Sequence, residues 1–267
     1  MHFQRFVPSA SLQYHVQFFW ALESTSDVQS FHTIPDGSPG LVFQQSVGAP
    51  IREYSGKPWP TLLLHGQTTR PGKMHTPGAF RLVGACLHPS ALHTLFQLPA
   101  AELTDACLDV ELLPTSNQSF SQQLQDEATV LGQIHQLSAF LVRSLHVGCR
   151  RPDVAIAHTV ATLVAAQGQV SLPRLRAASG LSERSFQRRF KQVVGVTPQL
   201  FARICRFQAS LHQLRTASYE QLSDVAYDHQ YADQSHHIRT FREFTGISPR
   251  HYRQQVRPEL SSFSALL

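Results

Sequence analysis

Two stretches near the C-terminus carry arginine-rich helical patterns that suit contact with nucleic acid. Residues 232–244 read ADQSHHIRTFREF and are followed by TGISP at 245–249. Displaced by 51 residues, SERSFQRRF at 182–190 and GVTP at 195–198 repeat that outline. Two copies of one basic helical unit in a single chain indicate a reader of double-stranded DNA.

Each copy has the pattern of a short helix, a turn of a few residues and a second helix, which is a helix-turn-helix unit. In the first copy Phe186, Phe190 and Val193 recur at helical spacing and are predicted to face inward. Arginine can bond guanine, and glutamine can bond adenine, through paired hydrogen bonds in the major groove. The candidate DNA-contacting residues left on the outer face are Arg184, Gln187, Arg188 and Lys191.

The second copy has the same two-sided pattern. His237, Phe241 and Phe244 are predicted to face inward. An isoleucine on the outer face could contact a thymine methyl group. The alternative is that these arginines are ordinary solvated surface residues. We favour it less because two helices carry matching faces of the same polarity. The outer candidates are Gln234, Ser235, Ile238, Arg239 and Arg242.

Positive charge is concentrated in the C-terminal third of the chain. The protein has 267 residues, a formal net charge of +5 and 42% hydrophobic residues, which is a globular composition. Residues 172–257 contain 14 Lys/Arg against 6 Asp/Glu, whereas residues 1–171 contain 9 against 11. This asymmetry is expected where one domain contacts the phosphate backbone of a nucleic acid and the other does not.

Cysteine usage and hydropathy favour a soluble, cytoplasmic protein. The 4 cysteines lie far apart without a C-x-x-C pair, which fits reduced thiols better than disulfides or a zinc finger. The N-terminus lacks the continuous apolar region of a signal peptide, and no run approaches the ~18 apolar residues of a spanning helix. We therefore expect no membrane partner.

Residues 1 to about 95 have the pattern of a small antiparallel sandwich or barrel, because short apolar runs alternate with Pro/Gly turns. The predicted strands lie at 16–22, 41–43, 61–64 and 80–83. Around 12–20 the periodicity leaves helix and strand both open. A helix is predicted at 89–96 and another up to about His146. The second carries an apolar stripe that either packs on its own domain, which we favour, or forms a dimer seam: Leu131, Ile134, Leu137, Leu141 and Leu145.

The remainder of the chain is predicted to be helical. Residues 148–152, GCRRP, form the clearest linker. We expect a regulatory, effector-binding or dimerisation domain at 1–148, a DNA-binding domain at 152–257 and a loose tail at 258–267. The fold class is α+β, with a β-rich, barrel- or cupin-like domain and trailing helices before an all-α domain with two helix-turn-helix units. Predicted helices span about 153–168, 172–178, 182–193, 197–216, 222–227, 232–244 and 248–256.

Residues 153–255 resemble the AraC/XylS family of bacterial transcription regulators. The resemblance implies that two recognition helices, joined by the long helix at 197–216, enter successive major-groove segments. It assigns base reading to Arg184, Gln187 and Arg188 in the first unit and to Gln234, Ser235, Ile238 and Arg239 in the second. The motifs that carry it are AxGLS at 178–182, FxRxF at 186–190, GVTP at 195–198, DxA at 224–226, DQSH at 233–236, Phe241, and GISPxxYR at 246–253.

Two positions depart from the family pattern in the second unit. Gln230 stands where a turn glycine is usual, so this turn must avoid or tolerate a positive φ. His237 stands where an inward phenylalanine is usual, and we interpret it as a hydrogen-bonded core histidine rather than a ligand. Either change could weaken the second unit, in which case the first would carry most of the specificity.

The N-terminal part resembles, through fewer motifs, the regulatory domain of one branch of the same family. These motifs are an aromatic segment ending in Trp20, IPDG at 34–37, HGQ at 65–67, Gly84, His88-Pro89 and LPAAEL at 98–103. The resemblance implies a small β-rich sensor or interaction domain followed by helices, and it names no ligand. Trp20 and Asp36 are candidate effector contacts, beside the simpler interpretation of a core residue and a turn residue.

Nothing in the sequence argues for catalysis or a cofactor. His32, His65, His75, His88 and His93 suggest a metal-dependent cupin enzyme, but their spacings form no metal signature. That enzyme, and a ligand-independent DNA-binding or dimerisation module, are the alternatives to a regulator that activates or represses transcription. The expected partner is double-stranded DNA; a small-molecule effector, RNA polymerase and a second copy of the chain are further candidates.

Overall fold

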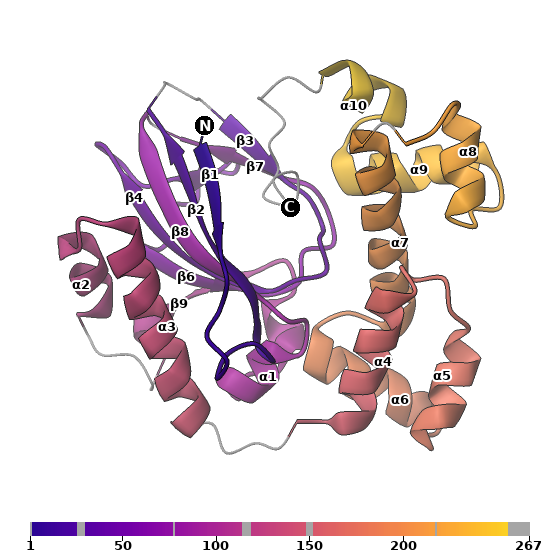
Figure 1. The fold of residues 1–267 in the computed structure, drawn as a ribbon, viewed down its shortest axis with the longest axis horizontal. Helices are drawn as coiled ribbons and strands as arrows, with labels where there is room; N and C mark the ends of the chain where they lie inside the picture. The colour runs from indigo at the N-terminus through magenta and orange to yellow at the C-terminus, as the bar shows by residue number, and fades with distance from the viewer. Residues whose placement is uncertain are drawn as a thin grey trace.

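A β-rich N-terminal body and a helical C-terminal body lie side by side in the computed structural model (Figure 1). The structure describes residues 2–25, 30–76, 78–113, 119–147, 152–216 and 218–255. The predicted linker residues 148–151 and the predicted tail at 258–267 lie outside these ranges, so the domain boundary stays a prediction. No helix in the described residues is long and apolar enough to cross a membrane.

Two antiparallel sheets form the N-terminal body. The larger has the strand order β1-β2-β8-β4-β6-β9 and the smaller the order β3-β7-β5. The four predicted strands are confirmed, and the stretch left open between helix and strand becomes strand from Val16 onward. The bounds are β1 His2–Phe6, β2 Val16–Ser24, β3 Ser30–Thr33, β4 Gly40–Ser46, β5 Arg52–Glu53, β6 Leu62–His65, β7 Gly72–His75, β8 Phe80–Leu87 and β9 Cys107–Asp109.

Both faces of the larger sheet are apolar because residues of β2 alternate between them. Phe19 and Ala21 pack with the helices on one face, whereas Phe18, Trp20 and Leu22 pack on the face toward the smaller sheet. This period of two is the geometry of a strand buried on both sides. The larger sheet therefore separates a helix-covered core from a second apolar space.

Helices cover one face of the larger sheet (Figure 1). The favoured interpretation of the leucine stripe holds for α3, because Ile134, Leu137 and Leu141 are buried in the core of its own domain. Leu131, by contrast, is 56% exposed. The bounds of these helical elements are α1 Ala91–Leu95, η1 Ala100–Leu103, η2 Val110–Leu112, α2 Phe120–Asp126 and α3 Val130–Val147.

The C-terminal body has two cores that share helix α7. Phe201 of α7 packs in the first core, and Phe207 and Leu211 of the same helix pack in the second. The two helix-turn-helix units are thus α5–α6 and α8–α9, placed at either end of α7 (Figure 1). The bounds are α4 Val154–Ala165, α5 Leu172–Ser179, α6 Glu183–Val194, α7 Pro198–Arg215, α8 Leu222–Asp228, α9 Gln234–Thr245 and α10 Pro249–Gln255.

Side-chain caps fix where these helices begin. The sequence predicts Ser182 as the cap of the helix through Val193 and Thr197 as the cap before Pro198. Both are confirmed: Ser182 Oγ accepts a hydrogen bond from the Ser185 amide at 3.4 Å, and Thr197 Oγ1 accepts one from Leu200 at 3.2 Å. Such caps satisfy amides that have no partner within the helix. The second recognition helix begins at Gln234 rather than at residue 232, because the Asp233 side chain is its cap.

In the turn of the second unit, a residue other than glycine adopts the left-handed conformation. Gln230 has φ +52°, so this turn tolerates the positive φ. The amide of Gln230 still bonds to the Tyr227 carbonyl at 3.0 Å, and that of Tyr231 to Ala226 at 2.9 Å. A side chain in this conformation costs free energy because its Cβ crowds the backbone.

Substituting Gln230→Gly should therefore stabilise the protein. Relief of the left-handed conformation gains about 1–2 kcal/mol, and the more flexible unfolded chain offsets about 0.4–1 kcal/mol of it. We expect a net gain of roughly 0.5–1 kcal/mol in the free energy of unfolding, measured by urea denaturation. Gln230→Ala is the control, because it keeps the Cβ and should give no comparable gain; equal stabilisation by both variants would contradict the explanation.

Candidate functional site

The first recognition helix, α6, presents the predicted polar face to solvent. Phe186, Phe190 and Val193 are buried in its core, as the periodicity predicted. Phe190 packs on Phe201 of α7, with ring centroids 5.8 Å apart. Of the candidate DNA-contacting residues, Arg184, Arg188 and Lys191 are exposed and Gln187 is half-buried.

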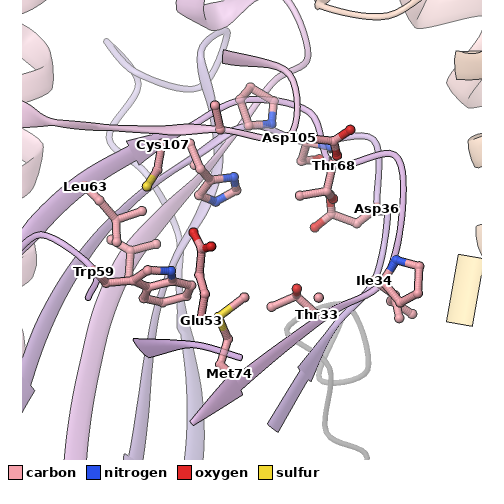
Figure 2. A pocket seen from close by; sticks show the side chains of 18 of the residues that line it. Thr33, Ile34, Asp36, Glu53, Trp59, Leu63, Thr68, Met74, Asp105 and Cys107 are labelled. Carbon is pink, nitrogen blue, oxygen red and sulfur yellow. Dashed lines mark hydrogen bonds between the residues drawn. The ribbon is translucent and has the colours of Figure 1, made fainter. Parts of the chain in front are cut away.

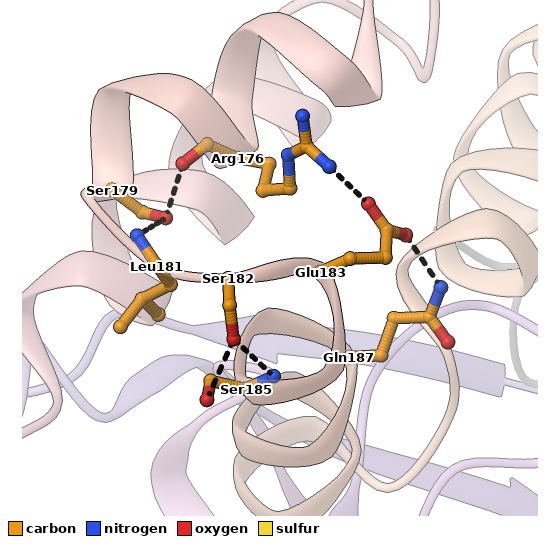
Figure 3. A network of polar contacts seen from close by, with 7 residues as sticks. All are labelled: Arg176, Ser179, Leu181, Ser182, Glu183, Ser185 and Gln187. Atoms are coloured by element: carbon orange, nitrogen blue, oxygen red, sulfur yellow. Dashed lines mark hydrogen bonds and ion pairs between the residues drawn. The ribbon is translucent and has the colours of Figure 1, made fainter.

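A polar network holds Gln187 at the start of α6 (Figure 3). Its Nε2 donates to Glu183 Oε1 at 2.7 Å, and Arg176 of α5 pairs with Glu183 Oε2 at 2.6 Å. The Gln187 amide, followed by Arg176, lowers the pKa of the Glu183 carboxyl. Because an amide nitrogen carries two hydrogens, Gln187 keeps one donor and its acceptor oxygen for a base edge.

The second recognition helix, α9, repeats this arrangement. Phe241 and Phe244 are buried against Phe207 of α7, with ring centroids 5.6 Å and 5.1 Å from it. Each recognition helix is also joined to a neighbouring helix by a charged pair: Arg189 of α6 to Asp153, the cap of α4, and Glu243 of α9 to Arg203 of α7. Of the predicted outer residues, Gln234, Ser235, Arg239 and Arg242 are exposed and Ile238 is half-buried.

His237 lies inside the second core, but the expected hydrogen bonds are absent. Its side chain is fully buried, between Tyr231 and Phe241 at centroid distances of 4.9 Å and 5.9 Å. Within the described part of the chain neither ring nitrogen has a partner. Burial, then the nearby His229 and His236, lower the pKa of His237 to about 4. The prediction of a core histidine is confirmed, and that of a hydrogen-bonded one is wrong.

A cavity of about 390 Å³ lies between the two sheets of the N-terminal body (Figure 2). Trp20 and Asp36, the two candidate effector contacts, both line it. Asp36 also has the predicted turn role, because its Oδ1 accepts a hydrogen bond from the Ser38 amide at 2.9 Å. Sequence reasoning missed Glu53 and Trp59 in this lining; the rarity of tryptophan was the one signal that could have singled out Trp59.

The five histidines considered for metal binding do not gather in one place. His65 lines the cavity, and His32, His75, His88 and His93 do not. In the ranges that the structure describes, no three His, Cys, Asp or Glu residues form a group able to hold a metal ion. His65 bonds through Nδ1 to the Gly66 carbonyl at 3.0 Å, and burial lowers its pKa. It is therefore a neutral ring at pH 7.

The N-terminal body contacts the end of α6 and lies near the end of α9. At the end of α6, Thr104 Oγ1 donates to the Gly195 carbonyl at 2.8 Å. A methyl group placed at Gly246, the matching glycine after α9, would lie 3.9 Å from the ring of Pro71. Both segments belong to the cavity wall or adjoin it: Pro71 lines the cavity, and so does Asp105, which follows Thr104 in the chain.

The loop between β3 and β4 lies on α7. Gln208 Nε2 donates to the Pro35 carbonyl, and Ile34 is part of the second helical core. Gly37 has φ +82°, and a methyl group placed there would lie 3.4 Å from the ring of Phe201. One loop therefore forms part of the cavity wall and also packs on the helix that carries both recognition helices.

Two family models cover most of the chain. Residues 4–109 match the Domain of unknown function (DUF6597), and residues 175–255 match the Helix-turn-helix domain. The chain is 30% identical over 135 residues to the HTH-type transcriptional activator RhaS of Escherichia fergusonii. This match covers 49% of the chain and 48% of the relative, so the chain spans about half the length of the curated relative it matches.

Solved structures of ToxT from Vibrio cholerae are similar to the chain at low sequence identity. ToxT of strain O395 aligns with 90% of this chain and 98% of its own, with a TM-score of 0.49 and 10% identity. Wild-type ToxT of strain SCE256 with a bound unsaturated fatty acid aligns with 91% and 94%, at a TM-score of 0.48 and 11% identity.

The buried His237 predicts acid sensitivity of the second unit. Its pKa of about 4 in the folded protein lies below the usual 6.5, so the unfolded chain binds the proton more tightly. Stability is then lost as the pH falls from about 6.5 toward 4. We expect His237→Phe to reduce the loss of unfolding free energy between pH 7 and pH 5 by about 1–2 kcal/mol.

Urea denaturation at the two pH values measures this difference. The control is the same substitution at exposed His135 on α3, which should leave the pH dependence unchanged. If His237→Phe unfolds with the wild-type pH dependence, the buried ring is not the acid-sensitive group.

Proposed function

We propose that this chain is a transcription regulator of the AraC/XylS family and that it reads two successive major-groove segments of DNA with α6 and α9. The observation that carries the proposal is the matched pair of exposed basic faces, each fixed by aromatic residues to one end of α7. A site-specific regulator needs donors that reach base edges from a rigid element. Both helices supply them, in a part of the chain rich in arginine.

In the first unit we assign base contacts to Arg184, Gln187 and Arg188, with Lys191 placed for phosphate. Arg184 and Arg188 are one helical turn apart and both exposed, which lets both reach one groove. Glu183 beside Gln187 would repel phosphate, so it favours an approach in which this edge of α6 faces bases.

In the second unit we assign base contacts to Gln234, Ser235, Ile238 and Arg239, with Arg242 on phosphate. The strained turn at Gln230 and the unpaired ring of His237 would weaken the second unit. We therefore expect the first unit to contribute the larger share of specificity, since preorganised donors lose less free energy on binding.

We further propose that the N-terminal domain senses a small molecule in its cavity and so modulates DNA binding. The support is physical continuity: the β3–β4 loop lines the cavity and also bonds to α7 through Pro35 and Gln208. A ligand that shifts this loop would change how α7 presents both recognition helices. The protein would act in the cytoplasm, where DNA is accessible. Contact of both recognition helices with DNA requires neither RNA polymerase nor a second copy of the chain.

Arg188→Ala and Arg239→Ala test the reading of bases. On a duplex recovered by genome-wide mapping of bound DNA, each should weaken binding by ~1–3 kcal/mol and relax the preference at one base position. Fluorescence anisotropy at several salt concentrations measures both effects, and wild-type affinity should fall steeply with salt because phosphate contacts release counterions.

The control variant is Lys57→Ala, which removes an exposed charge from the N-terminal body and should leave affinity within about 0.5 kcal/mol. Equal losses on specific and unrelated duplexes would reduce both arginines to phosphate contacts. An affinity independent of salt would contradict DNA binding through this basic surface.

Thr104→Val tests the contact between the N-terminal body and α6. The change removes the hydroxyl that bonds to the Gly195 carbonyl, a contribution of about 0.5–1.5 kcal/mol. We expect faster amide hydrogen exchange at the end of α6. Thr162→Val removes a similar hydroxyl-to-carbonyl bond within α4 and should leave α6 exchange unchanged; identical exchange in both variants would contradict the coupling.

A further inference from the structure

The cavity between the two sheets has aromatic walls. Phe3, Phe18, Trp20 and Trp59 all line it, and Phe3 and Trp20 are stacked with ring centroids 6.4 Å apart. The guanidinium of Arg5 lies 3.9 Å from the centroid of the Phe18 ring, so one of these rings already carries a cation. Aromatic faces attract cations more strongly where water is excluded.

Two carboxylates point into the cavity from opposite walls, Glu53 from the smaller sheet and Asp36 from the β3–β4 loop (Figure 2). Both side chains are half-buried. Glu53 accepts a hydrogen bond from Ser55 at 3.1 Å, and no lysine or arginine in the described ranges lies within 4.0 Å of it. An acid that lines a cavity without a cationic partner favours a positively charged ligand.

The basic groups of this lining lie at its rim and have other partners. The side chain of Arg70 is 77% exposed and lies 3.9 Å from Asp105. Lys73 is exposed, and its Nζ lies 5.0 Å from the centroid of the Tyr54 ring. Exposed charges are screened by water and salt, whereas charges inside the cavity are screened much less. Among the described residues, a carboxylate ligand would therefore meet the carboxylate of Glu53 inside the cavity and hydrated basic groups at its rim.

Three further titratable groups of the lining, His65, Cys86 and Cys107, are neutral at pH 7. Burial lowers the pKa of His65 and raises the pKa of the Cys86 and Cys107 thiols. With its proton on Nδ1, which faces the Gly66 carbonyl, His65 offers Nε2 as an acceptor of a hydrogen bond. The interior thus supplies acceptors, negative charge and aromatic faces.

We propose that this cavity binds an organic cation, a protonated amine or quaternary ammonium on a flat apolar body. The ammonium group would lie between Glu53 and Asp36, and the apolar body would lie against Trp20 and Trp59. This ligand class rests on the proposed sensing role of the N-terminal domain. Its regulatory consequence follows from Asp36, which belongs to the loop that packs on α7: a cation drawn to this carboxylate acts on the element that joins both recognition helices.

The two tryptophans of the protein both line the cavity, so intrinsic tryptophan fluorescence reports on its occupancy. Three test compounds of similar shape separate charge from shape: phenethylamine is a cation at pH 7, 2-phenylethanol is neutral and 3-phenylpropionate is an anion. Titrated into the full-length protein, phenethylamine should bind roughly tenfold or more tightly than either of the others. Equal affinities, a preference for the anion, or no binding of phenethylamine up to its solubility limit would overturn the proposal.

Variants locate the ammonium group. Glu53→Gln and Asp36→Asn should each lower the affinity for phenethylamine by roughly tenfold and leave that for 2-phenylethanol unchanged. Glu220→Gln, which removes an exposed acid between α7 and α8, is the matched control and should bind as wild type. Thermal unfolding of each variant checks that it is folded. An unchanged preference for phenethylamine in both cavity variants would overturn the assignment.

DNA binding of the same samples separates this inference from the proposed function. If the protein binds DNA but shows no preference for the amine, the proposed ligand class is wrong and the proposed regulator function still holds. If the protein prefers the amine but binds no DNA, the proposed ligand class is supported and the proposed regulator function is contradicted.

Discussion

One continuous helix determines how the two recognition helices are presented. The 18 residues of α7 correspond to a rod of about 27 Å, which is comparable with one turn of B-DNA, about 34 Å. Phe201 near its start supports α6, and Phe207 further along supports α9. Because aromatic residues in close-packed cores move little, the spacing of the two readers is fixed by a covalent element. The N-terminal loop packs on α7, so under the proposed function it would act on both recognition helices at once.

The helical half was largely predictable because its signals are local. Caps such as Ser182 and Thr197 and the periodicity of Phe186 and Phe190 depend only on nearby residues, and they placed the helices to within a few residues. Of the N-terminal body, the sequence predicted the strands β2, β4, β6 and β8 and the antiparallel class. It did not predict the strands β1, β3, β5, β7 and β9. Nor did it predict that β8 pairs with both β2 and β4, since pairing depends on contacts distant in sequence.

The site was predictable where one helix face defines it and unpredictable where several segments meet. The outer residues of α6 and α9 followed from helical spacing. The cavity did not, because Glu53, Trp59 and His65 come from different strands and loops. Local rules also could not show that His237 would be buried without hydrogen bonds, or that Ile34 of the N-terminal body would complete a core of the C-terminal one. Both depend on tertiary packing around a single side chain.

The central claim is that one chain reads DNA with two helices held apart by α7. Selection of bound duplexes from a random DNA pool by the full-length protein tests it most directly. If both helices read DNA, the enriched motif contains two blocks of specified base pairs, centred about one helical turn, or ~10 base pairs, apart. A single block of specified base pairs, or no sequence preference, would contradict it.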